Sequence, residues 1–284
     1  MLLVDELRQS MPFRASLLAG QSAIVTGGGS GIGRGIAIGL ALCGASVAVV
    51  GRHSESLQAV VSEIDGLGSQ GFAVTCDVRD PEAVGSAVAD ATRALGPLEI
   101  LVNNAGATFT APAEQLSPRG FRAVVETDTF GTFYMCSEFG RRRIAANSPG
   151  AILNITSTSP MTGNPGRLHG GVGKAGVDSM TKSLAVEWGP YGIRVNALAP
   201  GYTPTAGVNI ATRMVDDSAA HIERVAASVP LGRVGRVQDI VWAAVFLLSP
   251  AASFITGASL TVDGGKWLSS GRHFDPSGAE PAAN

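Results

Sequence analysis

Residues 22–53 read SAIVTGGGSGIGRGIAIGLALCGASVAVVGRH, and this stretch decides the fold. An apolar run at 22–26 leads into a glycine cluster, a segment of helical character follows, and a second apolar run lies at 47–50. A strand, a glycine turn, a helix and a strand in this order form a βαβ unit, whose two strands are parallel. The stretch therefore predicts an α/β fold built on a doubly wound parallel sheet.

The rest of the chain repeats this alternation of strands and helices. Further apolar runs predict strands at 71–75, 98–102, 150–157, 193–197 and 260–262. Between them, helices are predicted at 55–69, 81–95, 113–146, 174–188 and 239–248. We therefore expect about seven strands, with helices on both faces of the sheet.

The glycines of the first turn predict a dinucleotide site. Glycine lets the chain turn tightly and lets a pyrophosphate approach the backbone, while the helix N-terminus offers unpaired N–H groups and a partial positive charge. A purely structural turn is the alternative, because glycine-rich turns are common. The residues assigned to this part of the site are Gly27, Ser30, Gly31, Ile32 and Gly33.

Composition favours one domain and argues against several classes of partner. The 284 residues are 45% hydrophobic and 15% charged, and apolar runs alternate along the whole chain. This pattern favours a single domain over 1–284, with a lead-in at 1–20 and a tail at 269–284. The net charge is −2 and no basic stripe is present, so nucleic acid is not expected as a partner.

The sequence carries neither a recognisable targeting signal nor a metal-ligand pattern. No apolar run reaches the roughly 18 residues that a membrane helix needs, and the N-terminus lacks the pattern of a secretory signal. The three cysteines lack metal-ligand spacing, which predicts reduced core residues, no metal and a cytoplasmic location. They are Cys43, Cys76 and Cys136.

Motifs further along the chain point to a family. TGxxxGxG occupies 26–33, NNAG 103–106, NALAPG 196–201 and DGG 263–265. Together these motifs resemble those of the short-chain dehydrogenase/reductases, over roughly residues 18–268. The resemblance implies a Rossmann fold, an oxidoreductase acting on a small-molecule substrate, and a substrate lid at 202–228. It also implies a homotetramer or homodimer assembled through the helices around 113–146 and 174–188.

The end of the second strand predicts the choice of cofactor. NAD-specific folds usually carry an acid there, whereas here Gly51 leads directly to Arg52. A cation suits the 2′-phosphate of NADPH, and one charge-assisted hydrogen bond favours it roughly 10- to 150-fold. A solvated surface arginine is the alternative, and His53 is a weaker candidate contact.

The resemblance assigns further residues to the cofactor site. Asp77 and Val78 would lie beside the adenine, although Asp77 is also a candidate cap for the helix that starts near Pro81. The remaining assigned residues are Asn104, Ala105, Gly106, Thr156, Lys174, Pro200, Gly201, Thr203 and Thr205.

The chain departs from the usual family pattern at the catalytic position. Most members carry Tyr-x-x-x-Lys, but the residue four before Lys174 is Gly170. Ser157 keeps the usual spacing of the catalytic serine, and Asp128 stands where the family usually has Asn. A positioned general acid contributes roughly 10²–10⁴-fold. The protein is therefore inactive, uses another acid, or performs chemistry that needs no tyrosine at a carbonyl.

These two departures resemble one branch of the family, the 2,4-dienoyl-CoA reductases and in particular the peroxisomal type. In that branch NADPH reduces a conjugated thioester, and an Asp and the Lys organise the water that returns a proton. Asp128 and Lys174 would be this pair, since opposite charges hold each other ionised. Ser157 would bind the thioester oxygen. The substrate pocket would include Phe109, His169 and Tyr202.

Two other functions stay open at this point. The first is a carbonyl or imine reductase, or an alcohol dehydrogenase, in which Tyr202, His169 or water is the acid. The second is an NADPH-binding protein with little catalysis. Residues 202–232 contain few basic side chains to meet the phosphates of an acyl-CoA, which counts against that substrate. The candidates are Arg213 and Arg224 within this range and Arg233 directly after it.

Overall fold

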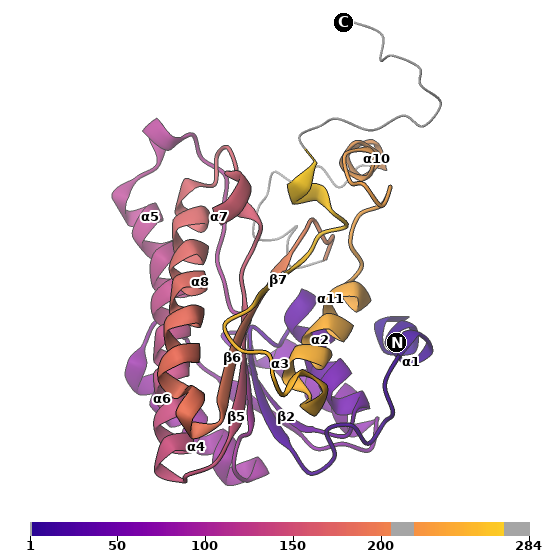
Figure 1. Ribbon diagram of the computed structural model, residues 1–284, viewed down its shortest axis with the longest axis vertical. Coiled ribbons are helices and arrows are strands. Elements are labelled where there is room, and N and C mark those ends of the chain that lie inside the picture. Colours follow the sequence, from indigo (N-terminus) through magenta and orange to yellow (C-terminus); the bar gives the residue numbers. More distant parts are fainter. Residues whose placement is uncertain (1, 206–218, 270–284) are drawn as a thin grey trace, which may run out of the picture.

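Seven parallel strands form one central sheet in this computed structural model, which describes residues 2–205 and 219–269. The strand order is β3-β2-β1-β4-β5-β6-β7, so the chain reverses its direction of winding between β1 and β4 (Figure 1). This is the doubly wound arrangement, in which ligands bind beyond the carboxyl ends of the strands near the reversal. The predicted fold is confirmed.

The strands are short apolar runs whose side chains are mostly buried. All five residues of β1 and the four central residues of β2 are buried, because helices cover both faces of the sheet. The strands are β1 (Ser22–Thr26), β2 (Ser46–Gly51), β3 (Gly71–Thr75), β4 (Ile100–Asn103), β5 (Gly150–Ile155), β6 (Ile193–Pro200) and β7 (Ser259–Val262).

The helices form two layers, one on each face of the sheet (Figure 1). One layer contains α1 (Leu2–Ser10), α2 (Gly31–Leu42), α3 (Ser54–Asp65) and α11 (Val237–Leu248). The other contains α4 (Pro81–Leu95), α5 (Pro118–Val125), α6 (Gly131–Ala145) and α8 (Leu168–Trp188).

Short helical segments lie between or beyond these elements. They are η1 (Ala113–Gln115), the π-helical turn η2 (Glu126–Phe130), α7 (Ser159–Thr162), η3 (Gly189–Tyr191), α10 (Ala219–Ala227), η4 (Pro250–Ala252) and η5 (Lys266–Leu268).

Most predicted elements are present, and two helices differ from expectation. The helix predicted at 174–188 begins six residues earlier, at Leu168. Glycines at 170, 171 and 173 made its first turns look irregular, since each costs up to about 1 kcal/mol in a helix. The stretch predicted as one helix over 113–146 is divided into η1, α5, η2 and α6.

The predicted helix cap at Asp77 is wrong. Asp80 caps α4 instead, because its side chain accepts the backbone N–H groups of Glu82 and Ala83. Asp77 turns to Arg79, whose guanidinium lies 2.5 Å from its carboxylate. The cap position directly precedes the proline that starts the helix, as the general rule requires.

The lead-in, which the sequence left undecided, packs against the domain. Leu7 and Leu18 are fully buried, and the indole N–H of Trp242 donates to the Ser10 hydroxyl at 3.0 Å. The cysteines are free and buried, as predicted. Across 2–205 and 219–269, no helix has the length and apolar character needed to cross a membrane. Most of the predicted lid, residues 206–218, and the tail beyond Ser269 lie outside the described residues.

Candidate active site

The glycine turn between β1 and α2 has the shape of a phosphate cradle. Gly27 and Gly31 have φ values of +63° and +54°, which side-chain-bearing residues rarely adopt. At Gly33 a Cβ atom would lie only 2.3 Å from the Asn104 amide nitrogen and the Gly27 carbonyl oxygen. Since α2 begins at Gly31, its free N–H groups face this turn. A dinucleotide pyrophosphate fits there.

Two polar side chains hold the turn in place. The Thr26 hydroxyl accepts the backbone N–H groups of Asn104 and Ala105, both at 3.0 Å. The Asn104 amide donates to the carbonyls of Thr26 at 3.1 Å and Gly27 at 3.2 Å. The sequence assigned Asn104 to the cofactor site, and the structure shows how it fixes the cradle. Thr205 lies over the same turn, because a Cβ at Gly31 would be 3.0 Å from its hydroxyl.

Arg52 and His53 follow β2 and are exposed at its carboxyl end. Nearby, hydrogen bonds from Arg79 hold the pKa of the Asp77 carboxyl below its usual value, and Arg52 adds to this effect. Arg52 and Asp77 therefore lie at the same rim of the sheet, where the adenosine end of a dinucleotide would meet them. Val78 is buried against Gly131, so it supports this rim from within.

The residues predicted after β5 and β6 lie at the same end of the sheet. The Thr156 hydroxyl donates to the Leu198 carbonyl and the Thr203 hydroxyl to that of Gly201, both at 3.2 Å. These side chains are therefore used within the protein. Pro200 ends β6, Gly201 packs closely on Asp263, and the Tyr202 ring meets the edge of His221 at 5.7 Å.

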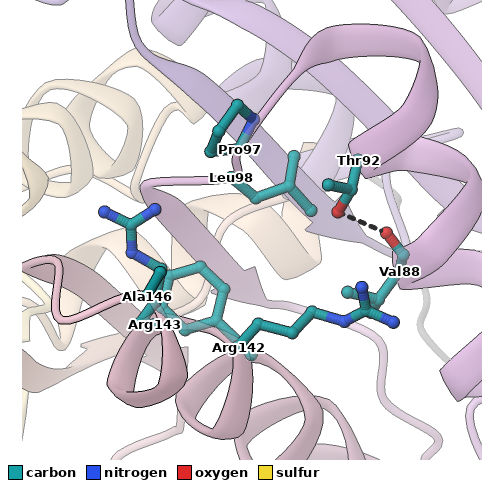
Figure 2. A pocket seen from close by; sticks show the side chains of 8 residues that line it. Val88, Thr92, Pro97, Leu98, Arg142, Arg143 and Ala146 are labelled. Carbon is teal, nitrogen blue, oxygen red and sulfur yellow. Dashed lines mark hydrogen bonds between the residues drawn. The ribbon is translucent and has the colours of Figure 1, made fainter.

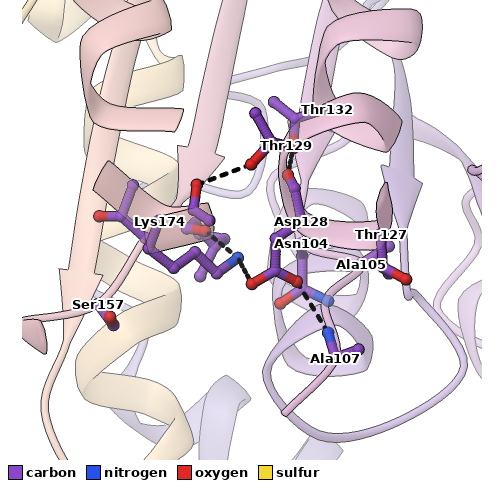
Figure 3. A network of polar contacts seen from close by, with 12 residues as sticks. Asn104, Ala105, Ala107, Thr127, Asp128, Thr129, Thr132, Ser157 and Lys174 are labelled. Carbon is purple, nitrogen blue, oxygen red and sulfur yellow. Dashed lines mark hydrogen bonds and ion pairs between the residues drawn. The ribbon is translucent and has the colours of Figure 1, made fainter. Parts of the chain in front are cut away.

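Asp128 and Lys174 form a buried charged pair at the carboxyl ends of β4 and β5 (Figure 3). The Asp128 side chain is almost wholly buried, and one carboxylate oxygen lies 3.9 Å from the Lys174 ammonium. The other oxygen accepts the backbone N–H of Ala107 at 2.8 Å. Lys174 donates to the Ile155 carbonyl at 2.9 Å. The sequence predicted this pair, and the structure brings it together.

The π-helical turn η2 places Asp128. A π turn accommodates an extra residue in a helix and is frequent at functional sites. Here it lies between α5 and α6, and Asp128 is its only buried residue. The turn packs against α8, where the Thr129 hydroxyl donates to the Gly173 carbonyl at 3.0 Å. A Cβ at Gly173 would lie 3.1 Å from Asp128, so this glycine permits the close contact.

The two charges of this pair interact electrostatically without a direct hydrogen bond. Burial raises the pKa of Asp128, while the Lys174 charge and the Ala107 N–H act in the opposite direction. A separation of 3.9 Å is too long for a direct hydrogen bond, and it is compatible with one bridging water. The pair can therefore hold a water or a substrate oxygen between a carboxylate and an ammonium.

Gly170 leaves open space where the family tyrosine would begin. A Cβ there would have the Thr108 hydroxyl, 3.8 Å away, as its nearest neighbour. No other side chain has replaced the tyrosine at this point. Ser157 is partly exposed just after β5, on the same side as Lys174 (Figure 3).

Phe109 and His169 form one wall of this region. Their rings stack with centroids 4.2 Å apart and planes at 26°. Phe109 is partly exposed, whereas His169 has no exposed surface and therefore lies behind it. The sequence assigned both to the substrate pocket, and in this conformation Phe109 alone has surface for a substrate.

Some residues of the site were missed. Ala107 contributes a backbone N–H and Thr108 a hydroxyl. A single sequence does not distinguish such an alanine or threonine from the many others in the chain. The π turn was missed as well, because its residues continue an ordinary helical pattern. Gly106 was assigned to the cofactor, and it also borders the charged pair, since a Cβ there would lie 3.1 Å from Asp128.

A separate hollow lies at the opposite end of the sheet, between α4 and α6 (Figure 2). It measures about 210 Å³ and is mainly apolar. Its lining includes Leu98, which precedes β4, so it is remote from the carboxyl ends of the strands and from the glycine turn. We do not assign it to the active site.

Comparison with known proteins identifies the relatives of this chain. Residues 27–266 match the family model described as enoyl-(acyl carrier protein) reductase. A probable 2,4-dienoyl-CoA reductase of Bacillus subtilis is 41% identical, over 87% of this chain and 97% of its own length. A peroxisomal 2,4-dienoyl-CoA reductase of Arabidopsis thaliana is 38% identical, over 92% of this chain and 89% of that protein.

A solved structure of a relative has the same fold. Gluconate 5-dehydrogenase from Burkholderia cenocepacia, in complex with NADP and tartrate, matches with a TM-score of 0.83 at 32% identity. The match covers 90% of this chain and 98% of that one. The chain belongs to the short-chain dehydrogenase/reductase family. It is an NAD(P)-dependent oxidoreductase acting on a small-molecule substrate.

Proposed function

We propose that this oxidoreductase uses NADPH to reduce a conjugated carbon–carbon double bond, and that its substrate is a 2,4-dienoyl-CoA. The observation that carries the proposal is the buried Asp128–Lys174 pair beside the open space at Gly170. A ketone reductase needs an acid at the carbonyl oxygen, and no tyrosine is placed there. A conjugated thioester needs its proton at carbon, which a held water can supply.

The protein's part in this reaction is to place substrate and proton. NADPH, when bound in the glycine cradle, supplies the hydride. Ser157 donates a hydrogen bond to the thioester oxygen, where negative charge develops. Asp128 and Lys174 hold a water across their 3.9 Å gap; its proton passes to the substrate carbon, and the Lys174 ammonium reprotonates the hydroxide that remains. Lys174 is kept in position by the Ile155 carbonyl and Asp128 by the Ala107 N–H.

Sequence similarity to 2,4-dienoyl-CoA reductases supports this choice of substrate. The first experiment follows NADPH absorbance with a trans,trans-2,4-dienoyl-CoA, beside a panel of ketones including gluconate-type keto acids. Dienoyl-CoA turnover that collapses in Asp128→Ala supports the proposal. Ketone reduction without dienoyl-CoA turnover would overturn it and direct attention to Tyr202 as the acid.

A carbonyl reductase is the second candidate function. It is favoured by the similarity to gluconate 5-dehydrogenase and by Gly170, where no side chain occupies the position of the family tyrosine. Loss of ketone reduction in Tyr202→Phe would support it. Tight NADPH binding with no turnover of either substrate class would instead indicate a protein with little catalysis.

The preference for NADPH over NADH is also part of the proposal. Arg52 is exposed at the end of β2, where the 2′-phosphate would lie. Arg52→Ala should lower the ratio of NADPH to NADH binding roughly 10- to 150-fold. The matched control is Arg93→Ala, an exposed arginine on α4 paired with Asp90. An unchanged ratio in Arg52→Ala would exclude this role.

We also propose that the protein assembles into a homodimer or homotetramer through α6 and α8. Large apolar side chains are exposed on this side of the molecule: Phe130 and Phe133 at η2 and α6, and Leu168 and Val172 on α8. Such a surface suits a self-complementary interface. Light scattering at micromolar concentration tests it, and a monomer mass would contradict it. The cytoplasmic location stays a prediction.

A further inference from the structure

His169 is a fully buried side chain whose two ring nitrogens make no hydrogen bond of normal geometry. Within 2–205 and 219–269, the only other buried side-chain nitrogen or oxygen atom in this condition is Asn103 Oδ1. Its one polar contact, with the Phe109 carbonyl, falls short of hydrogen-bond geometry, so burying the imidazole costs free energy, and an apolar ring would stack on Phe109 equally well. Packing alone therefore gives no reason for an imidazole here.

Two separate chain segments that contact Asp128 also carry or contact His169, which places the two side chains in the same region. On α8, His169 lies four residues before Gly173, so both occupy the same helix face. Gly173 is in direct contact with Asp128, since a Cβ there would lie 3.1 Å from the Asp128 Cβ. On the loop side, Ala107 donates its N–H to Asp128, and Phe109, two residues further on, stacks on His169.

From this arrangement we infer that His169 is a positioning residue for Asp128, and that its imidazole, together with Lys174, keeps the Asp128 carboxylate in the charge state that holds the water. The inference rests on the function proposed above for Asp128. His169 itself has no surface exposed to a ligand in this conformation, in which the Phe109 ring stacks on it.

Few ionisable groups face the two residues. From α8 and the residue before it come Lys174, His169 and Arg167. The loop at 104–112 contains no ionisable side chain. Glu126, on η2 itself, acts on Arg79. The other charges of α5, those of Arg119 and Arg122, are exposed to solvent. Lys174 and His169 are therefore the groups nearest to the carboxylate that favour its ionised form.

The electrostatic directions agree with this geometry. Burial lowers the pKa of His169, while the Phe109 carbonyl and the Asp128 charge raise it and Arg167 lowers it. Burial raises the pKa of Asp128, and Lys174, Ala107 and His169 lower it. Removing the imidazole should raise the pKa of Asp128 further. Asp128 would then become protonated at a higher pH than in the wild type.

The test compares the wild type with His169→Phe, which keeps a ring on Phe109, and with His169→Asn. We would measure kcat/KM against pH, and also the infrared band of the protonated carboxyl in cofactor-free protein. Asp128→Asn assigns this band. The acid limb and the band should both move to higher pH, by roughly half a unit or more. Both variants lack the titrating ring, so whichever one folds gives the answer.

Lys182→Gln is the matched control, since it removes an exposed cation from the same helix and should shift neither readout. The inference would be overturned if the pH midpoint of the infrared band were unchanged and kcat/KM fell by the same factor at every pH. That result would show that His169 contributes only packing. A shifted band without dienoyl-CoA turnover would retain the inference while refuting the proposed substrate, so the two failures can be told apart.

Discussion

Two buried polar clusters lie near the carboxyl ends of β4 and β5, and they are built in opposite ways. The amide cluster consists of Asn103, Cys136, Asn154 and Thr181. Asn103 donates to Asn154 at 2.9 Å and to the Cys136 sulfur at 3.2 Å, and Asn154 donates to Thr181 at 2.9 Å. Burial raises the pKa of Cys136 to about 12, so the whole cluster is neutral.

The charge cluster consists of Asp128, His169 and Lys174. Its carboxylate and ammonium are 3.9 Å apart, and its imidazole has no hydrogen bond of normal geometry. The amide cluster uses all of its hydrogen-bonding groups within the protein except one acceptor, the buried Asn103 Oδ1. The charge cluster leaves capacity unused at a cost in stability. Under the proposed function, this difference separates groups that hold the sheet together from groups that hold and position the reacting water.

The largest expected effect is the loss of turnover in Asp128→Asn. The amide keeps the shape of the side chain but removes the charge that holds the water, so kcat/KM should fall by roughly 10²–10⁴-fold. Steady-state kinetics with the dienoyl-CoA measure this. Asp178→Asn is the matched control, because Asp178 is paired with Lys182 on the surface of α8. An equal fall of kcat/KM in Asp128→Asn and Asp178→Asn would mean that the charge cluster has no special role in turnover.

The second effect concerns stability and should fall on the other cluster. Asn154→Ala leaves Asn103 and Thr181 without their partner in a buried site and opens a small void. The free energy of unfolding should drop by roughly 2–4 kcal/mol. Asn164→Ala, at an exposed asparagine, should have little effect. Urea unfolding gives both values. If Asp128→Asn were equally destabilising, the charge cluster would have to be regarded as structural too.

A smaller effect appears in the pH dependence of stability. Burial raises the pKa of Asp128 in the folded protein above its unfolded value. Below the unfolded pKa the carboxyl is protonated in both states and costs nothing. As the pH rises through the folded pKa, the wild type loses stability relative to Asp128→Asn.

The stability advantage of Asp128→Asn should therefore be small in acid and grow toward neutral pH, while remaining below the loss expected for Asn154→Ala. Urea unfolding of both proteins at several pH values measures it. An advantage that instead shrinks as the pH rises would mean that Lys174 outweighs burial.

The sequence predicted much of this arrangement, for reasons that can be traced to particular residues. The βαβ pattern and the glycine spacing predicted the sheet, because both depend on local chemistry. Asp128 and Lys174 were predicted as a pair from a resemblance, and the structure adds their 3.9 Å separation. The early start of α8 could not be predicted, since it depends on Gly173 packing against Asp128. The burial of His169 likewise depends on Phe109, sixty positions away.

The smallest structural change with an informative result is Gly170→Tyr, which restores Tyr-x-x-x-Lys beside the charge cluster. A Cβ at Gly170 has no neighbour nearer than 3.8 Å, and tyrosine favours a helix over glycine by a few tenths of a kcal/mol, so stability should change by less than about 1 kcal/mol. Ketone-dependent NADPH oxidation should increase, because the phenol would now meet a carbonyl oxygen near Ser157 and Lys174.

Gly171→Tyr is the control for that gain. It adds the same ring one residue along α8, about 100° around the helix, where a Cβ would meet nothing within 4 Å. An equal gain in both variants would mean that an added phenol acts without regard to position. A gain in Gly170→Tyr alone would show that the charge cluster still has the geometry of a carbonyl reductase, with the missing tyrosine as the difference that directs it toward carbon–carbon reduction.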